Sequence, residues 1–435
     1  MMEKTKVAII GMGTVGSGVA KILLDHGDRT ARHAGRTLWL EKVVVRDLDK
    51  PRDCDLPADV LTTDLSEVTE NDEIKVVAQL IGGLEPARTI MLKLLESGKD
   101  IVTANKALLA VHGPELFDRA RELGRSIAFE ASVAGGIPII TNISQCLSAN
   151  QITSLGGILN GTSNFIVSQM EEHGADYQTA VKEAQRLGFA EADPTMDVDG
   201  TDAAQKLAIL AHLAFGARVD ADKIPKIGID KLDPIDLRWA SDLGYRIKLL
   251  AVAQLHDEQL ELHVSPTLVK IGTPLAEVRG ANNAISVVGD MVGRVFYHGL
   301  GAGQLPTASA VAADMIDTAV GRTGITFRTL ELWSDKQPTV ALSDYAFAKG
   351  RFYLRFTVRD NPGVLAQVTN ILGSHDISIA SVIQREIDPA ESTEDKVSLV
   401  IMTHLATEGN ANQAVSEINQ LPSVDDVSVR MRVLD

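Results

Sequence analysis

The feature that most restricts the fold is a glycine-rich turn at residues 11–16. Residues 6–10 (KVAII) are a short apolar run typical of a buried parallel strand, the turn GMGTVG follows, and residues 17–24 read as a helix. Glycines at these spacings close the turn, admit a pyrophosphate to the backbone and let the helix pack on the strand. A Rossmann-like dinucleotide site is therefore predicted, and a glycine turn without a ligand is the alternative. The expected contacts are Gly11, Gly13, Thr14, Val15 and Gly16.

Further apolar runs suggest that the strand belongs to a parallel α/β sheet. Strands are expected at residues 39–45, 75–81, 100–103 and 126–130, with a helix at 87–97. Residues 26–37 are polar and basic and are expected to form a loop before the second strand. Alternating strands and helices predict right-handed crossovers and ligands at the carboxyl ends of the strands.

The end of the second strand bears on the choice of cofactor. A site specific for NAD(H) has an acid there to bind the ribose hydroxyls, but here Arg46 comes first and Asp47 follows. Because arginine can pair with a 2′-phosphate, the sequence favours NADP(H), or use of both NADP(H) and NAD(H). Arg46 as an ordinary surface arginine is the alternative.

The pattern changes near residue 138. A helix at 139–146 is followed by expected strands at 152–159 and 259–268 and by helices at 164–173, 175–187 and 201–215. This mixture predicts an α+β substrate and dimerisation domain. A second glycine loop at 298–308 precedes a helix at 309–320, which is expected to return to the first domain.

Residues 184–206 concentrate the charged groups suited to catalysis. They contain five acids and end in a lysine: Glu191, Asp193, Asp197, Asp199, Asp202 and Lys206. Thr201 is the expected N-cap of the next helix, which puts Asp202 and Lys206 one turn apart on one face. A surface ion pair beside a solvated acidic loop is the alternative, and a carboxylate beside a lysine in a polar pocket would instead suit carbonyl reduction.

The C-terminal part restarts a compact unit. Residues 351–358, 377–386, 396–404 and 424–433 read as strands, with helices from 362 to 374 and from 410 to 421. This order is βαββαβ, a ferredoxin-like arrangement. The chain is thus expected to divide into 1–137 with a return helix at about 303–322, 138–302, a linker at 323–349, and 350–435.

Composition excludes several classes of protein. The 42 basic and 58 acidic residues give a net charge of −16, which disfavours nucleic acid as a partner. Two cysteines, Cys54 and Cys146, rule out a disulfide scaffold and suit a reducing compartment. With a first strand near residue 4 there is no room for a signal peptide, and no run is long enough to span a membrane, so a cytoplasmic protein is expected.

The acidic stretch also carries a family resemblance. The residues GFAEADP at 188–194, DVDGTD at 197–202 and Lys206 resemble the signature of homoserine dehydrogenases. The resemblance implies a nicotinamide-dependent interconversion of L-homoserine and L-aspartate 4-semialdehyde, in threonine and methionine biosynthesis. It implies that Lys206 donates the proton, that Asp202 orients Lys206 and holds substrate, and that Glu191 and Gly188 bind substrate.

The same resemblance gives roles to three further segments. Lys106, in TANK at 103–106, lies at the junction of cofactor and substrate in this family, and Gly303 lies beside the cofactor. A monovalent cation, Na⁺ or K⁺, is held there by main-chain carbonyls, which correspond here to Glu130, Val133, Gly135 and Ile137. For Lys106 the alternative is a surface lysine at a helix start, and for the glycine loop it is a turn between domains.

The start of the last unit, DNPGVL at 360–365, resembles an ACT domain, an amino-acid sensor that usually pairs through its sheet. This implies feedback by an amino acid, threonine by analogy, and a homodimer or homotetramer. The alternative is a ferredoxin-like domain that only dimerises.

Two other functions stay open at this point. Aspartate-semialdehyde dehydrogenase chemistry needs a cysteine nucleophile, but Cys146 lies in an apolar helix without an adjacent histidine. A non-catalytic sensor would use the nucleotide fold and the ACT domain only to bind ligands.

Overall fold

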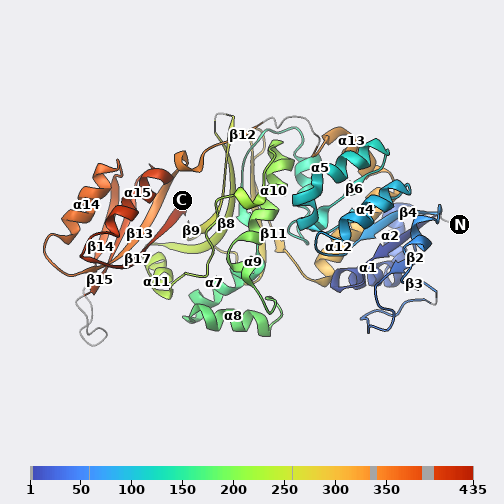
Figure 1. The fold of residues 1–435 in the computed structure, drawn as a ribbon, viewed down its shortest axis with the longest axis horizontal. Coiled ribbons are helices and arrows are strands. Elements are labelled where there is room, and N and C mark those ends of the chain that lie inside the picture. The colour runs from blue at the N-terminus through green and yellow to red at the C-terminus, as the bar shows by residue number, and fades with distance from the viewer. Residues whose placement is uncertain (1–2, 58, 257, 334–339, 385–395, 435) are drawn as a thin grey trace.

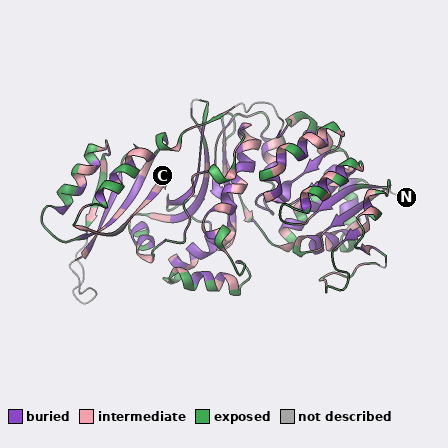
Figure 2. Ribbon diagram, in the orientation of Figure 1, coloured by how far each residue is buried: buried purple, intermediate pink, exposed green. Residues whose placement is uncertain are grey.

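The computed structural model describes residues 3–57, 59–256, 258–333, 340–384 and 396–434. The molecule is elongated, with a parallel sheet at one end, a mixed sheet in the middle and a small α/β unit at the other end (Figure 1). Strands are mostly buried, and the exposed residues lie along the outer faces of the helices and in the loops (Figure 2). This arrangement confirms the predicted fold class.

The N-terminal sheet has the strand order β3-β2-β1-β4-β5-β6, and all of its pairs are parallel. This is the doubly wound order that places a ligand where the strand order reverses, between β1 and β4. The strands are β1 (Lys4–Ile10), β2 (Thr37–Val44), β3 (Leu61–Thr62), β4 (Ile74–Gln79), β5 (Asp100–Thr103) and β6 (Ile127–Ala128).

Helices cover both faces of this sheet. They are α1 (Thr14–Asp25), α2 (Gly27–Ala34), α3 (Ser66–Thr69), α4 (Ala87–Glu96), α5 (Lys106–Glu122), α12 (Gln304–Ala319) and α13 (Arg322–Leu330). The prediction of a loop at 26–37 was wrong, because α2 forms there: Thr30, Ala31 and Ala34 are buried and Gly35, at φ 65°, ends the helix.

The helix after the second glycine loop begins at Gln304, five residues before the expected start. It packs on α1, and the approach is so close that a Cβ atom at Gly18 would lie 2.8 Å from the Cβ of Ala308. In Figure 1, α12 accordingly lies beside α1 although nearly three hundred residues separate them.

The first part of the stretch expected to be a linker is packed helix. Phe327 of α13 stacks on Phe117 with 5.3 Å between ring centroids, and Trp333 stacks on His212 at 4.8 Å. Residues 334–339, also in that stretch, lie outside the described residues.

The central sheet has the order β11-β10-β7-β8-β9. Its strands are β7 (Ile152–Ile158), β8 (Tyr245–His256), β9 (Gln259–Lys270), β10 (Asn282–Gly289) and β11 (Gly293–Leu300). The associated helices are α6 (Ile139–Thr141), which continues as a π-helix at Asn142–Cys146, then α7 (Gly161–His173), α8 (Tyr177–Arg186), α9 (Thr195–Val198), α10 (Thr201–Phe215) and α11 (Pro234–Asp242).

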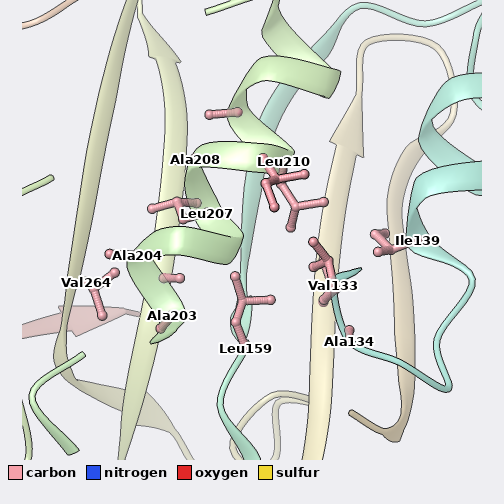
Figure 3. Close-up of a cluster of buried hydrophobic side chains, with 14 of the residues drawn as sticks. Val133, Ala134, Ile139, Leu159, Ala203, Ala204, Leu207, Ala208, Leu210 and Val264 are labelled. Carbon is pink, nitrogen blue, oxygen red and sulfur yellow. The ribbon is translucent and has the colours of Figure 1, made fainter. Parts of the chain in front are cut away.

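Helix α10 is the centre of the core. Figure 3 shows Ala203, Ala204, Leu207 and Leu210 of this helix beside Leu159, with the glycine-rich loop at Val133 and Ala134 close by. These side chains are at most 1% exposed. The helix is therefore held rigidly between the sheet and that loop, and its first turn has a fixed position.

The C-terminal unit has the predicted order βαββαβ. It contains β13 (Lys349–Arg359), α14 (Val364–Ser374), β14 (Ile379–Gln384), β15 (Lys396–Thr403), α15 (Glu408–Ile418) and β17 (Val424–Leu434), with a short β16 (Ala406–Thr407). Residues 385 and 386, expected to end the second strand, lie outside the described residues.

This unit continues the central sheet. Its strand order is β17-β13-β15-β14, and residues 432–434 of β17 pair in parallel with residues 267–269 of β9. The two regions thus share one 11-stranded sheet, which β12 (Ala341–Leu342) joins through β9. No local pattern in the sequence predicts this pairing.

Candidate active site

The glycine turn lies at the carboxyl end of β1, beside the start of α1. Gly11 has φ 97°, and a Cβ atom at Gly16 would lie 2.2 Å from the carbonyl oxygen of Gly11. The N-cap of α1 is Gly13, and no side chain caps the helix there. Thr14 and Val15 form its first turn, so free backbone N–H groups are available to a phosphate.

Arg46 and Gly303 lie around the same end of the sheet. Arg46 is exposed, two residues past the end of β2, and β2 is tied to the turn by the hydrogen bond from the Gly11 N–H to the Val44 carbonyl at 2.9 Å. Gly303, at φ 118°, is the N-cap of α12. The neighbouring Gln304 carbonyl would lie 3.0 Å from a Cβ atom at Gly18 of α1. Apart from Lys106, the predicted cofactor residues thus come from three segments at one edge of the sheet.

Lys106 begins α5 and is held by the residue before it. The Asn105 side chain accepts a hydrogen bond from the Leu108 N–H at 3.1 Å and donates to the carbonyls of Ile81 and Gly83, at 3.0 and 2.7 Å. Asn105 therefore caps the helix and fixes it to the loop that follows β4.

The structure joins the three predicted catalytic side chains into one chain of ion pairs. Asp202 accepts from Lys106 Nζ through Oδ1 at 2.6 Å and from Lys206 Nζ through Oδ2 at 2.7 Å. Lys206 also donates to the Leu159 carbonyl at 2.8 Å. An ammonium group has three N–H donors, and within the described part of the chain the third has no protein acceptor.

Charge pairing dominates the electrostatics of this group. Asp202 is 4% exposed, and burial by itself would raise its pKa, but Lys206 and Lys106 outweigh burial and hold the pKa well below its usual range. Burial likewise opposes the charged form of Lys106, but Asp202 raises the pKa of this lysine above its ordinary value. Both groups are therefore charged at neutral pH.

The expected N-cap of α10 was wrong. The cap residue is Gly200, with φ 88°, and Thr201 is the first helical residue, whose N–H donates to Asp199 Oδ1 at 2.7 Å. A left-handed backbone at position 200 favours glycine over a side-chain cap. The one-turn spacing of Asp202 and Lys206 is unaffected.

Gly188 and Glu191 lie in the exposed loop after α8. Gly188 has φ 77°, and Glu191 is near enough to raise the pKa of Lys106. The loop is fixed to α7 because the Phe189 carbonyl accepts from Thr162 Oγ1 at 2.6 Å and the Phe189 ring lies 4.8 Å from that of Phe165. The exposed Glu191 carboxylate thus acts on the charge of Lys106, and within the described part of the chain it forms no ion pair with Lys106 or Lys206.

Two residues that were not assigned to the site lie inside it. The Asn160 amide donates to Asp202 Oδ2 at 2.8 Å and to Asp197 Oδ1 at 2.7 Å. Burial raises the pKa of Asp197, and the hydrogen bond from Asn160 partly offsets this. The signal in the sequence is the polar run NGTSN at 160–164, directly after an apolar strand, a pattern that also fits a plain turn.

The loop expected to hold a cation lies against the second glycine loop. A Cβ atom at Gly135 would lie 3.0 Å from the Gly301 carbonyl, and the Ile137 carbonyl accepts from the Ile139 N–H at 2.8 Å. The Glu130 carboxylate accepts from the N–H groups of Ile140 and Thr141, each at 2.8 Å, and Val133 is fully buried. Across the described ranges, His, Cys, Asp and Glu side chains form no cluster of three that could hold a metal.

Two further findings concern the class of protein. Cys146 is exposed and ends the π-helix, and no ion pair or hydrogen bond links it to the lysine and aspartate group in the described residues. None of the helices within those residues is long and apolar enough to cross a membrane.

Comparison with known proteins identifies the family. Residues 138–316 match the family model described as homoserine dehydrogenase, residues 11–130 match the NAD binding domain of homoserine dehydrogenase, and residues 352–423 match the ACT domain. The homoserine dehydrogenases of Pseudomonas aeruginosa and Bacillus subtilis are 45% and 39% identical to the chain, each over 99% of both chains.

Solved structures agree with these matches. A homoserine dehydrogenase from Thiobacillus denitrificans superposes with a TM-score of 0.91 at 40% identity, covering 100% of this chain and 99% of that one. The S. aureus homoserine dehydrogenase at pH 7.5 superposes with a TM-score of 0.76 at 31% identity, and the match covers 99% of this chain and 99% of that one. With its nucleotide-binding sheet, its paired lysines around Asp202 and its C-terminal ACT domain, the chain belongs to the homoserine dehydrogenase family.

Proposed function

We propose that Lys206 is the proton donor when L-aspartate 4-semialdehyde is reduced to L-homoserine, and the proton acceptor in reverse. As hydride reaches the aldehyde carbon, negative charge grows on the oxygen, so a cation there stabilises the transition state more than the ground state. The observation that carries this role is the fixed ammonium of Lys206, whose two bonds to Asp202 and Leu159 leave one N–H for substrate.

Asp202 and Lys106 complete the proposed catalytic group. Asp202 accepts a bond from one lysine at each of its oxygens and so fixes both lysines. It also contacts the substrate in this proposal. Lys106, whose side chain is 34% exposed against 11% for Lys206, supplies positive field near the nicotinamide or the substrate carboxylate.

The loop after α8 is the proposed binding site for the amino end of the substrate. Glu191 is exposed and negatively charged, as binding of an ammonium group requires, and Gly188 offers its backbone. This assignment is supported by the electrostatic influence of Glu191 on the pKa of Lys106, which Glu191 helps to raise.

The glycine turn at 11–16, with Lys106 and Gly303, is proposed to bind the nicotinamide cofactor, which accepts or donates the hydride when bound. Arg46 at the end of β2 favours NADP(H), since an exposed guanidinium there suits a 2′-phosphate better than two hydroxyls. Use of NAD(H) as well is compatible with an exposed arginine that binds no ribose hydroxyl.

A monovalent cation, Na⁺ or K⁺, is proposed at the carbonyls of Glu130, Val133, Gly135 and Ile137. Oxygen donors of this kind suit a hard cation. One of the four carbonyl oxygens, that of Ile137, already accepts a hydrogen bond from the Ile139 N–H. It would therefore bind the cation through its second lone pair.

The ACT domain is proposed to sense threonine as feedback on threonine and methionine biosynthesis, in a homodimer or homotetramer in the cytoplasm. Support comes from the family match at 352–423 and from the sheet shared with the catalytic region. The division at 137/138 and 349/350 remains our proposed domain organisation.

The test is reduction of NAD and of NADP by the purified protein with L-homoserine, with and without threonine. We expect turnover, a preference for NADP and inhibition by threonine. Equal rates with both cofactors would remove Arg46 as a discriminating residue, and an unchanged rate with threonine would point to another effector or none. No turnover with either cofactor in folded protein would overturn the catalytic assignment.

A further inference from the structure

Asn160 lies at the junction of two elements that support the catalytic group. β7 ends at Ile158, and Asn160 is the N-cap of α7, where its Oδ1 accepts from the Ser163 N–H at 2.7 Å. A serine or an aspartate would cap the helix about as well. Capping therefore does not explain why an amide stands here.

The other end of the same side chain faces two acids. Its Nδ2 lies 2.7 Å from Asp197 Oδ1 and 2.8 Å from Asp202 Oδ2. An amide has two N–H donors, and here each has a carboxylate acceptor. The orientation of the amide is set by these partners, because the reverse assignment would put a donor against the Ser163 N–H and an acceptor against two carboxylates.

The residue before it holds the lysine. The Leu159 carbonyl accepts from Lys206 Nζ at 2.8 Å and also from Asn283 Nδ2 at 3.0 Å. The dipeptide 159–160 thus contacts both members of the Asp202–Lys206 pair, one through its carbonyl and one through its side-chain amide. It is itself fixed on the start of β10 through Asn283.

We propose that Asn160 is a positioning residue for the dehydrogenase reaction, whose amide fixes the Asp202 carboxylate so that Lys206 presents its remaining N–H to the reacting oxygen. Asp202 then accepts three bonds, one from Lys106 at Oδ1 and two, from Lys206 and Asn160, at Oδ2, which leaves a lone pair of Oδ1 for substrate. The bridge also separates two carboxylates that would otherwise repel each other across the site. This inference rests on the proposed role of Lys206.

The test compares Asn160→Ser, Asn160→Asp and Lys206→Ala with the wild-type enzyme. Both Asn160 variants keep an N-cap acceptor and lose the amide donors, and the aspartate adds a third negative charge. We expect kcat for homoserine oxidation to fall about tenfold in the serine variant and by more in the aspartate variant, since small displacements of catalytic groups are costly. KM for the nicotinamide cofactor should stay close to wild type. The melting temperature should fall, and more so in the aspartate variant, because Asp197 and Asp202 lose buried donors.

Asp176 provides the matched control. It caps α8 by accepting from the Thr179 N–H at 2.9 Å, it is exposed, and it contacts none of the catalytic residues. Asp176→Ser should leave kcat unchanged. If Asn160→Ser and Asn160→Asp both stay within twofold of the wild-type kcat while Lys206→Ala is slow, Asn160 is only a cap and the inference is wrong. A Lys206→Ala variant near the wild-type rate would instead overturn the proposed proton transfer, and the positioning role with it.

Discussion

Lys106 Nζ lies 2.6 Å from Asp202 Oδ1, although the two residues are in the first turns of helices that belong to different parts of the fold. Lys106 starts α5 at the carboxyl end of the parallel sheet, and Asp202 is in the first turn of α10 in the core of the central region. The pair therefore joins the nucleotide-binding sheet to the helix that carries Lys206.

Replacing Lys206 should remove the proton donor without removing the cofactor site. We expect Lys206→Ala to lower kcat by roughly 100-fold or more, the scale of general acid–base catalysis, with cofactor affinity little changed. Steady-state rates and cofactor binding measured on the same preparation would check this. Lys182→Ala, at an exposed position on α8, is the control and should leave kcat and cofactor affinity unchanged. A Lys206→Ala enzyme within a few-fold of wild type would contradict the assignment.

Asp202→Asn should destabilise the protein in a pH-dependent way. The variant leaves two lysines without their buried counter-charge, a change that costs on the order of 3 kcal/mol. Because the folded pKa of Asp202 is depressed, its contribution is present above the unfolded pKa of about 3.9 and is lost as the pH falls from there through the folded pKa. In denaturant unfolding, the free energy of unfolding of the variant should thus be well below that of wild type at pH 7, and the difference should shrink below about pH 4. A constant deficit would show that charge pairing is not its source.

Glu191→Ala should mainly weaken substrate binding. Loss of a carboxylate that binds the substrate ammonium is expected to raise the apparent KM for homoserine with a smaller effect on kcat. Glu191→Gln keeps the size of the side chain and removes its charge, so it shows which of the two determines KM. Glu183→Ala, which removes the half-buried partner of the exposed Arg186 on α8, is the control. An unchanged KM in both Glu191 variants would exclude this residue from the ammonium site.

The sequence was a good guide where one local pattern determines the structure. The apolar run and glycine turn at 6–16 predicted the first strand, helix and sheet type, and Asp202 and Lys206 are one turn apart whatever the rest of the chain does. Contacts over long separations were out of reach. The resemblance placed Lys106 at the junction of cofactor and substrate, but its ion pair with Asp202 was not predicted. The bridge from Asn160 likewise depends on how β7, α9 and α10 pack. The helix at Gly27–Ala34 was missed because polar residues dominate it and only three of its side chains are buried.

Lys248 should make stability rise with pH on the alkaline side. It is 1% exposed, and burial lowers its pKa from 10.5 to about 8 although it donates to the Val278 carbonyl at 2.6 Å. Between these two values the unfolded chain binds a proton that the folded protein does not, so stability increases with pH there, by roughly 3 kcal/mol in all. Lys248→Met should remove that rise in unfolding experiments from pH 7.5 to 10.5. If the free energy of unfolding of Lys248→Met rises with pH as steeply as that of wild type, Lys248 is not the source of the rise.

The ACT domain is attached by a buried ion pair, which changes how its role should be tested. Asp236 of α11 is fully buried and accepts from Arg355 at 2.6 and 2.8 Å and from the Tyr353 hydroxyl at 2.8 Å, both residues being on β13. Deleting residues from 350 onward would leave this carboxylate unpaired and expose the edge of β9. We therefore expect the truncated enzyme to lose threonine inhibition but also stability.

Point variants at this contact distinguish the attachment of the ACT domain from its proposed response to threonine. Arg355→Met should destabilise the protein by about 3–5 kcal/mol, since it strands a buried charge, and Asp236→Asn combined with Arg355→Met should recover part of that loss. If threonine acts through the docked ACT domain, the single variant should also weaken threonine inhibition while leaving uninhibited turnover near wild type. Full inhibition in Arg355→Met, with the expected loss of stability, would mean that the effector signal reaches the catalytic lysines by a route that does not include this ion pair.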